Sequence, residues 1–427
     1  MKFTVIFFLT LLILVPGHLF AKVYFDVYAS GFKKIVIAVP YLKSQEPSKL
    51  RTEIPELIQK DLEFSGFFTC APWSILDRDF QEEGIEKTEI SFNKWKSIGV
   101  EILLKGKVQE QGDEIITEIY LYDTTYGSLE FAKRYKTKKA GLIPLIHRIC
   151  DDIIESVTGA RGILSSKLLF VSGPKGATEI FISGIDGFGM RKLTDYKTIT
   201  VLPSMSPDGK YLSYTSYREG KPHLYIFDME KGTQVFVDRE EGVKVGKEWL
   251  DRKTLIYTHT SGRYSSIVKF DVENKTKKVL LKKEGIVASP SPSPDGKKIV
   301  FTSDMYGTPQ IFTLDLATGE IKRLTYQGKY NASPVYSPKG DLIAFVSKID
   351  GALEICVMDP SGDNVRMLTN SGGINDSPHF SPCGRYLVFS SQKGGKTSIS
   401  LMFVNGENKR TLSFTGQNEM QPRFVPQ

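Results

Sequence analysis

Downstream of residue 166, short apolar segments recur along the chain at a constant interval. Segments 298–302 and 342–346 are rich in β-branched and aromatic residues and are bounded by turn residues, which predicts β-strands. One aromatic residue recurs every 43 or 44 positions, at Phe170, Tyr214, Tyr257, Phe301, Phe345 and Phe389. A branched aliphatic residue follows at the same interval, at Ile180, Leu224, Ile267, Ile311, Ile355 and Ile399. We therefore predict six copies of one structural unit.

Most copies contain a turn with the pattern Ser-Pro-X-Gly. It stands at residues 206–209, 293–296, 337–340 and 381–384, and a degraded form stands at 249–253. Proline presets one backbone angle of a tight turn and glycine accepts a positive φ, so this turn separates two strands. The strands are too short and too often interrupted by Gly and Pro for a helical solenoid. Four strands in each copy are typical of a β-propeller blade.

The repeat begins and ends out of phase. Its first copy opens at 167–171, which corresponds to the second strand of a unit. The C-terminal residues 421–426 match 377–382, around the end of a first strand, and then stop. We therefore predict that residues 167–427 form an all-β, six-bladed β-propeller closed by the C-terminal strand, with no open edge between the first and last blades.

Residues 22–158 lack the repeat and predict a small α/β N-terminal domain. Apolar residues at helical spacing predict helices at 48–64 and 141–157. Strands are predicted at 34–39, 101–108, 115–122 and 129–135. Residues 159–166, which contain Gly159 and Gly162, are expected to link the two domains.

Residues 1–21 have the organisation of a secretory signal peptide. Lys2 precedes a short apolar run, which Pro16 and Gly17 interrupt before a cleavage site predicted after Ala21. An uncleaved membrane anchor is the alternative, but the apolar run is short and broken. We therefore expect an exported protein.

Charge, cysteine and histidine patterns narrow the possible chemistry. The net charge of +7 is carried by short basic segments spread along the chain, so we expect no nucleic-acid binding. The four cysteines are Cys70, Cys150, Cys356 and Cys383. They are too few for a disulfide scaffold; a Cys70–Cys150 bridge and buried free thiols both remain open. No CxxC, HxxxH or HExxH spacing occurs, so we predict neither a metal site nor a cofactor.

Catalytic motifs are missing as well. The sequence contains no G-x-S-x-G nucleophile elbow, and residues 184–189 imitate a glycine-rich loop but lie between two predicted strands. Aspartates recur at the ends of predicted strands, at Asp228, Asp271, Asp315 and Asp359, where we interpret them as turn formers. We predict no catalytic residues and no enzymatic activity.

The combination of signal peptide, small α/β domain and SPDG-type propeller resembles the TolB family of periplasmic proteins. In the first domain, Trp95 and Gly99 precede a predicted strand that runs to Gly106, which is similar to the family pattern. The resemblance implies a non-enzymatic scaffold of the Tol–Pal envelope system, located in the periplasm and expected to be monomeric. Such a scaffold would support outer-membrane integrity and cell division.

The resemblance also implies two partners. A TolA-like inner-membrane protein would bind the mature N-terminal segment, at Val23, Tyr24, Phe25, Asp26 and Val27. A Pal-like peptidoglycan-associated lipoprotein would bind the propeller mouth, at Val243, Gly246, Ala288, Asn331, Ser333, Asn375 and Ser377. Chain direction places the N-terminal domain at the end with the Ser-Pro-X-Gly turns, which leaves the opposite mouth free for this partner.

A different class of function is the alternative. A secreted propeller enzyme or a glycan-binding protein would use the central channel instead of the mouth. Turnover, or saturable binding of oligosaccharides, would distinguish these proteins from a scaffold.

Overall fold

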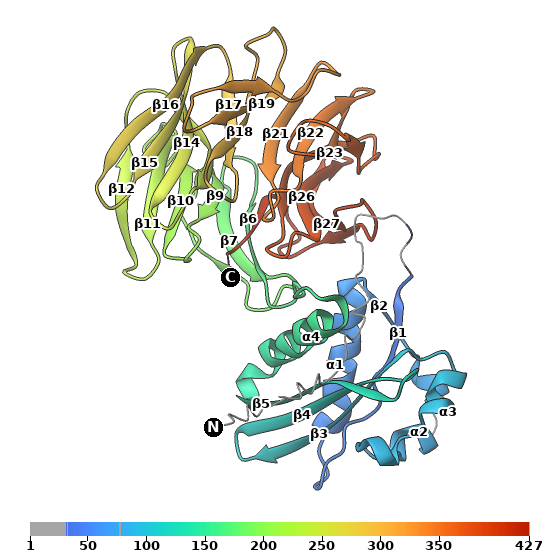
Figure 1. The fold of residues 1–427 in the computed structure, drawn as a ribbon. Helices are drawn as coiled ribbons and strands as arrows, with labels where there is room; N and C mark the ends of the chain where they lie inside the picture. Colours follow the sequence, from blue (N-terminus) through green and yellow to red (C-terminus); the bar gives the residue numbers. More distant parts are fainter. Residues whose placement is uncertain (1–30, 32, 77, 427) are drawn as a thin grey trace, which may run out of the picture.

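The computed structural model describes residues 31, 33–76 and 78–426. They form an N-terminal α/β domain followed by a β-propeller (Figure 1). The predicted signal peptide and the predicted TolA-like segment, residues 23–27, lie outside the described residues. Within the described part, no helix has the length and apolar character needed to cross a bilayer.

A five-stranded sheet forms the centre of the N-terminal domain, in the order β2-β1-β3-β4-β5. Its strands are β1 (Ile35–Ala38), β2 (Phe68–Cys70), β3 (Ile102–Gln111), β4 (Glu114–Asp123) and β5 (Ser128–Lys138). β1 is parallel to β2 and β3, whereas β3, β4 and β5 are antiparallel. The predicted strands are all present, and β2 is an addition too short to show a period in the sequence.

Helices cover both faces of this sheet. The two predicted helices, α1 (Leu50–Ser65) and α4 (Leu142–Thr158), pack in one cluster with Ile37 and Leu104. The neighbouring residues Ala38 and Leu103 point to the other face, because side chains alternate along a strand. There they pack near Trp95 of α3 (Phe92–Ser97), and α2 (Arg78–Glu82) lies beside it. Three single-turn helices complete the domain, at Trp73–Ile75, Lys87–Glu89 and Lys139–Gly141.

The propeller is a ring of mostly antiparallel sheets (Figure 1). Four sheets have four strands each, in the orders β29-β6-β7-β8, β12-β11-β10-β9, β13-β14-β15-β16 and β17-β18-β19-β20. An eight-stranded sheet contains β21 to β28, and its two halves meet where Leu353 pairs with Ile374. As predicted, the C-terminal strand β29 pairs with β6, the first strand of the propeller.

The propeller strands have the following bounds. The first three sheets in chain order contain β6 (Lys167–Ser172), β7 (Glu179–Gly184), β8 (Arg191–Lys192), β9 (Thr200–Met205), β10 (Tyr211–Ser216), β11 (His223–Asp228), β12 (Thr233–Asp238), β13 (Val243–Trp249), β14 (Thr254–Ser261), β15 (Tyr264–Asp271) and β16 (Thr276–Glu284). The remaining strands are β17 (Val287–Pro292), β18 (Lys298–Ser303), β19 (Gln310–Asp315), β20 (Ile321–Arg323), β21 (Asn331–Tyr336), β22 (Ile343–Ile349), β23 (Ala352–Met358), β24 (Arg366–Met367), β25 (Ile374–Phe380), β26 (Tyr386–Lys393), β27 (Lys396–Phe403), β28 (Arg410–Leu412) and β29 (Glu419–Phe424).

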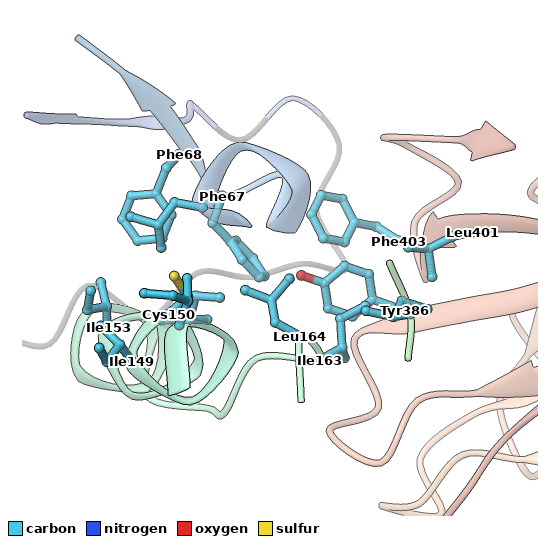
Figure 2. Close-up of a cluster of buried hydrophobic side chains, with 14 of the residues drawn as sticks. Phe67, Phe68, Ile149, Cys150, Ile153, Ile163, Leu164, Tyr386, Leu401 and Phe403 are labelled. Atoms are coloured by element: carbon cyan, nitrogen blue, oxygen red, sulfur yellow. The ribbon is translucent and has the colours of Figure 1, made fainter. Parts of the chain in front are cut away.

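The hydrophobic core of the N-terminal domain continues into the propeller. Figure 2 shows Phe67 and Leu164 lying against Tyr386 and Phe403, which belong to β26 and β27. The ring of Phe67 lies 5.1 Å from that of Phe403 and 6.0 Å from that of Tyr386, measured between centroids. The two domains therefore share one core at this contact.

Buried hydrogen bonds fix the same contact. The Tyr386 hydroxyl donates to the Ser65 carbonyl at 2.7 Å, and the Arg385 guanidinium donates to the Thr158 carbonyl and hydroxyl at 2.7 and 2.6 Å. Arg385 and Tyr386 directly follow the Ser-Pro-X-Gly turn at 381–384. The N-terminal domain therefore contacts the propeller at the end where this turn lies, as chain direction predicts.

Candidate protein-binding face

A bulge with left-handed backbone marks the innermost strand of each group of propeller strands. The residues with positive φ are Leu202 (57°), Gly246 (57°), Ser289 (50°), Ser333 (52°), Ser377 (55°) and Gln421 (54°). The pairing register shifts beside each of them, in β9, β13, β17, β21, β25 and β29. Such bulges bend a strand and increase its twist. The six residues line one cavity of about 270 Å³ that all six inner strands enclose.

Gly246 is the position where this geometry most clearly requires glycine. A Cβ atom there would stand 2.8 Å from the Ser289 backbone, closer than real Cβ contacts. The inner strands β13 and β17 can therefore approach each other closely at Gly246 because this residue has no side chain.

Three polar contacts join different inner strands around this cavity. Arg423 forms an ion pair with Glu248, Ser333 donates to Asp376 at 3.2 Å, and the Gln421 amide oxygen accepts from the Leu202 backbone N–H at 2.7 Å. Across the residues that the structure describes, no group of three or more His, Cys, Asp or Glu is placed to hold a metal ion. The three polar contacts tie the inner strands to one another around the cavity.

Exposed apolar side chains gather at the end of the propeller where the inner strands begin. They are Val243 (42% exposed), Ile286 (44%), Tyr330 (36%) and Ile374 (47%). β25 runs from Ile374 to Phe380 and is followed by the turn that leads to Tyr386 and the N-terminal domain. Because a strand rises about 3.3 Å per residue, the six steps from Ile374 to Phe380 place Ile374 roughly 20 Å from the end of the propeller that contacts the N-terminal domain. We call the surface defined by these four residues the free face.

Two tyrosines extend the free face over the sheet β17-β18-β19-β20. Tyr306 and Tyr326 are both 70% exposed, and the Arg323 guanidinium lies 5.9 Å and 4.9 Å from their ring centroids. Exposed aromatic and arginine side chains beside aliphatic ones are the composition that protein interfaces favour. The free face therefore has the character of a protein-binding surface.

The sequence-predicted partner residues lie at this end of the propeller but not on one surface. Val243 is exposed on the free face, and Ala288 is half-buried in β17. Gly246, Ser333 and Ser377 line the cavity.

Asn331 and Asn375 are also predicted as partner residues, and in the structure both side chains are buried. The Asn375 amide donates to Glu354 at 2.8 Å and to the Ser371 hydroxyl at 2.7 Å. The Asn331 amide donates to Gln310 at 2.9 Å and to the Gln327 carbonyl at 2.8 Å. These asparagines hold the loops in place. Their contact with a partner stays a prediction, and it would require these internal hydrogen bonds to break.

The predicted partner residues do not include Ile286, Tyr330 and Ile374, although the structure exposes all three on the free face. All three stand at the repeat interval from Val243, so the periodicity that identified the strands also contained this signal.

Comparison with known proteins agrees with the architecture. The family model described as TolB beta propeller domain matches residues 154–427, and that of the TolB amino-terminal domain matches residues 23–129. The solved structure of TolB from Acinetobacter baumannii superposes with a TM-score of 0.81 at 23% identity, covering 93% of this chain and 98% of that chain. This likeness shows a common fold.

Curated relatives match over part of their length. The chain is 31% identical over 293 residues to a Protein TolB homolog of Chlorobium luteolum, covering 69% of this chain and 66% of the relative. It is 32% identical over 249 residues to the Tol-Pal system protein TolB of Desulfosudis oleivorans, covering 57% and 56%. The chain thus spans between half and two thirds of the length of these relatives. With the propeller model matching more than half of its residues, the chain belongs to the TolB family.

Proposed function

We propose that this protein is a non-enzymatic periplasmic scaffold of a Tol–Pal envelope system. The name of the Desulfosudis oleivorans relative, a Tol-Pal system protein, supports this assignment. In this role it binds a Pal-like lipoprotein with the free face and a TolA-like inner-membrane protein with residues 23–27. It thereby links the two membranes, supports outer-membrane integrity and takes part in cell division.

The proposed organisation has four parts. Residues 1–21 are a signal peptide, 22–158 the α/β domain, 159–166 the linker and 167–427 a six-bladed propeller. The eight-stranded sheet counts as two blades of four strands, because its halves are β21–β24 and β25–β28 and each begins with a bulged inner strand. The molecule acts as a monomer in this assembly.

The observation that carries the proposal is the free face. Its four defining apolar residues stand at matching positions where neighbouring inner strands begin, and each of them is exposed. A few central residues, among which Trp, Tyr and Arg are enriched, contribute most of the binding free energy in protein complexes, and the free face has Tyr330 among its exposed side chains. The N-terminal domain lies at the other end of β25, so this face is open to a partner.

The test is a pair of substitutions on the free face, Tyr330→Glu and Ile374→Glu. Each places a charge among apolar residues and is expected to weaken binding by on the order of ten- to a hundredfold, the effect of losing a central contact. Isothermal titration against the soluble domain of the Pal-type lipoprotein from the same genome measures the affinity. Tyr126→Glu, at an 82% exposed site on the N-terminal domain, is the matched control and leaves the affinity unchanged.

Two outcomes contradict the proposal. If the unsubstituted protein does not bind the lipoprotein domain, the Pal-like protein is not a partner. If Tyr126→Glu loses as much affinity as the free-face variants, the free face is not the binding site. Thermal unfolding of each variant checks that the substituted proteins remain folded.

A further inference from the structure

The positive charge of the chain is concentrated in one propeller sheet. Residues 243–284, which form β13 to β16, contain eleven Lys or Arg against five Asp or Glu, a net charge of +6. The whole chain has a net charge of +7. The sheet β13-β14-β15-β16 therefore carries a much larger net positive charge than an average stretch of the same length.

Much of this charge lies on β16, the outermost strand of that sheet. Lys278, Lys282 and Lys283 are exposed there, and within the described residues none of them has a carboxylate partner within 4 Å. Lys278 also stands directly opposite Lys269 of β15. Like charges facing each other across two strands destabilise a sheet, so the fold itself gains nothing from this arrangement.

Apolar side chains lie among these lysines. Val279 is 55% exposed and Tyr264 is 44% exposed, and the Lys282 ammonium lies 5.1 Å from the centre of the Tyr264 ring. In the β15–β16 pairing Tyr264, Val279 and Lys282 lie on one face of the sheet and Lys278 and Lys283 on the other, so together they surround its outer strand. We call Tyr264, Lys278, Val279, Lys282 and Lys283 the basic edge.

We propose that the basic edge docks onto an anionic phospholipid surface. Clustered lysines are attracted to the negative potential of anionic lipids, and exposed Tyr and Val side chains can enter the interfacial region of the bilayer. Lysine is a flexible point charge without the planar fork that binds single phosphates, so the chemistry fits a diffuse anionic surface rather than one defined ligand.

Edge protection explains only part of this composition. Lysines on an outer strand prevent pairing with other chains, but that role requires neither exposed apolar residues nor a concentration of almost the entire net charge. The place of β16 in the fold supports docking. It lies at the outer rim of the ring, far from the N-terminal domain (Figure 1), so the contact between the two domains leaves the basic edge accessible.

Vesicle co-sedimentation tests the proposal, with the chain beginning at Lys22. The protein is expected to bind phosphatidylglycerol vesicles, to leave phosphatidylcholine vesicles unbound, and to dissociate as salt shortens the electrostatic range. Because each lysine near an anionic surface changes the affinity about fivefold, Lys278→Gln, Lys282→Gln and Lys283→Gln together should weaken it about a hundredfold.

A charge-matched control separates this surface from net charge alone. Substitution of Lys231, Lys339 and Lys393 by Gln removes the same charge from exposed sites of other sheets and should change the affinity little. Equal losses in the two triple variants, or no binding to phosphatidylglycerol vesicles, overturn the proposal. Binding to soluble polyphosphate as tight as binding to the vesicles also overturns it, because the ligand is then a soluble polyanion. No Pal-like protein is present, so the result is independent of the proposed scaffold function.

Discussion

Removal of one hydroxyl group at the domain contact should loosen the whole molecule. Tyr386 is buried, packs against Phe67 and Phe403, and donates its hydroxyl to the Ser65 carbonyl at 2.7 Å. Tyr386→Phe keeps the ring and its packing but removes the donor. The Ser65 carbonyl, at the end of α1, then loses this partner in a place that water reaches poorly.

The magnitude follows from the two contributions of the side chain. A buried polar group left without its hydrogen bond costs about 1–3 kcal/mol, which is the destabilisation expected for Tyr386→Phe. Tyr386→Ala also removes the ring from the core shared by the two domains, and large aromatic truncations cost about 3–5 kcal/mol. The phenylalanine variant should therefore show roughly a third to a half of the loss in the alanine variant.

Two measurements report this loss. Calorimetry should show a lower unfolding temperature for both variants, and limited proteolysis should cut residues 159–166 faster, because the domains separate more often. Tyr126→Phe changes an 82% exposed tyrosine and should stay within about 0.5 kcal/mol of the parent protein. If Tyr386→Phe is as stable as Tyr126→Phe, the hydrogen bond to Ser65 does not hold the domains together.

Two further substitutions separate stability from binding. Burial raises the pKa of Asp61 from 3.8 to about 6, in spite of the charge of His147 at 3.7 Å, so the folded protein loses stability as pH rises from 3.8 through 6. Asp61→Asn should therefore raise the free energy of unfolding by about 1–3 kcal/mol at pH 8 and by much less at pH 4. Urea unfolding measures both values, and equal gains at the two pH values would contradict this prediction. Asn375→Ala should lower stability by about 1–3 kcal/mol because Glu354 loses a buried donor, yet leave the partner affinity of the folded protein nearly unchanged. Ile374→Glu should instead weaken partner binding and leave stability nearly unchanged, because its side chain is exposed. Unfolding and titration of the two variants compare these effects.

The sequence predicts the framework well because the framework is repetitive. The spacing of Phe170 and its counterparts locates the second strand of every unit, and the degraded turn at 249–253 is found by interval although its residues have changed. Helices α1 and α4 are predicted within two residues of their ends, since both carry long amphipathic patterns. By contrast, β2 and α3 are too short to show a period, and contacts with the rest of the domain determine them.

The candidate site is harder to predict because periodicity gives a position along a strand but not the direction of a side chain. Asn375 and Ile374 are neighbours in the chain, yet one is buried against Glu354 and the other faces solvent. The bulge at Ser377 changes the alternation of inward and outward positions just beyond them. The contact of Tyr386 with Ser65 joins residues 321 positions apart, and no local pattern signals it.

The pairing of β29 with β6 has a consequence for the order in which the molecule can be completed. The Ser172 hydroxyl at the end of β6 lies 2.7 Å from the hydroxyl of Thr415 in the loop before β29, although these residues are 243 positions apart in the chain. During synthesis the inner edge of β6 therefore stays unpaired while almost all of the propeller is made, and unpaired strand edges are where chains associate wrongly. The sheet of the N-terminal domain uses strands between residues 35 and 138 and can form long before. The N-terminal domain can therefore fold earlier than the propeller, and β6, the first propeller strand to be synthesised, has an unpaired edge for the longest time.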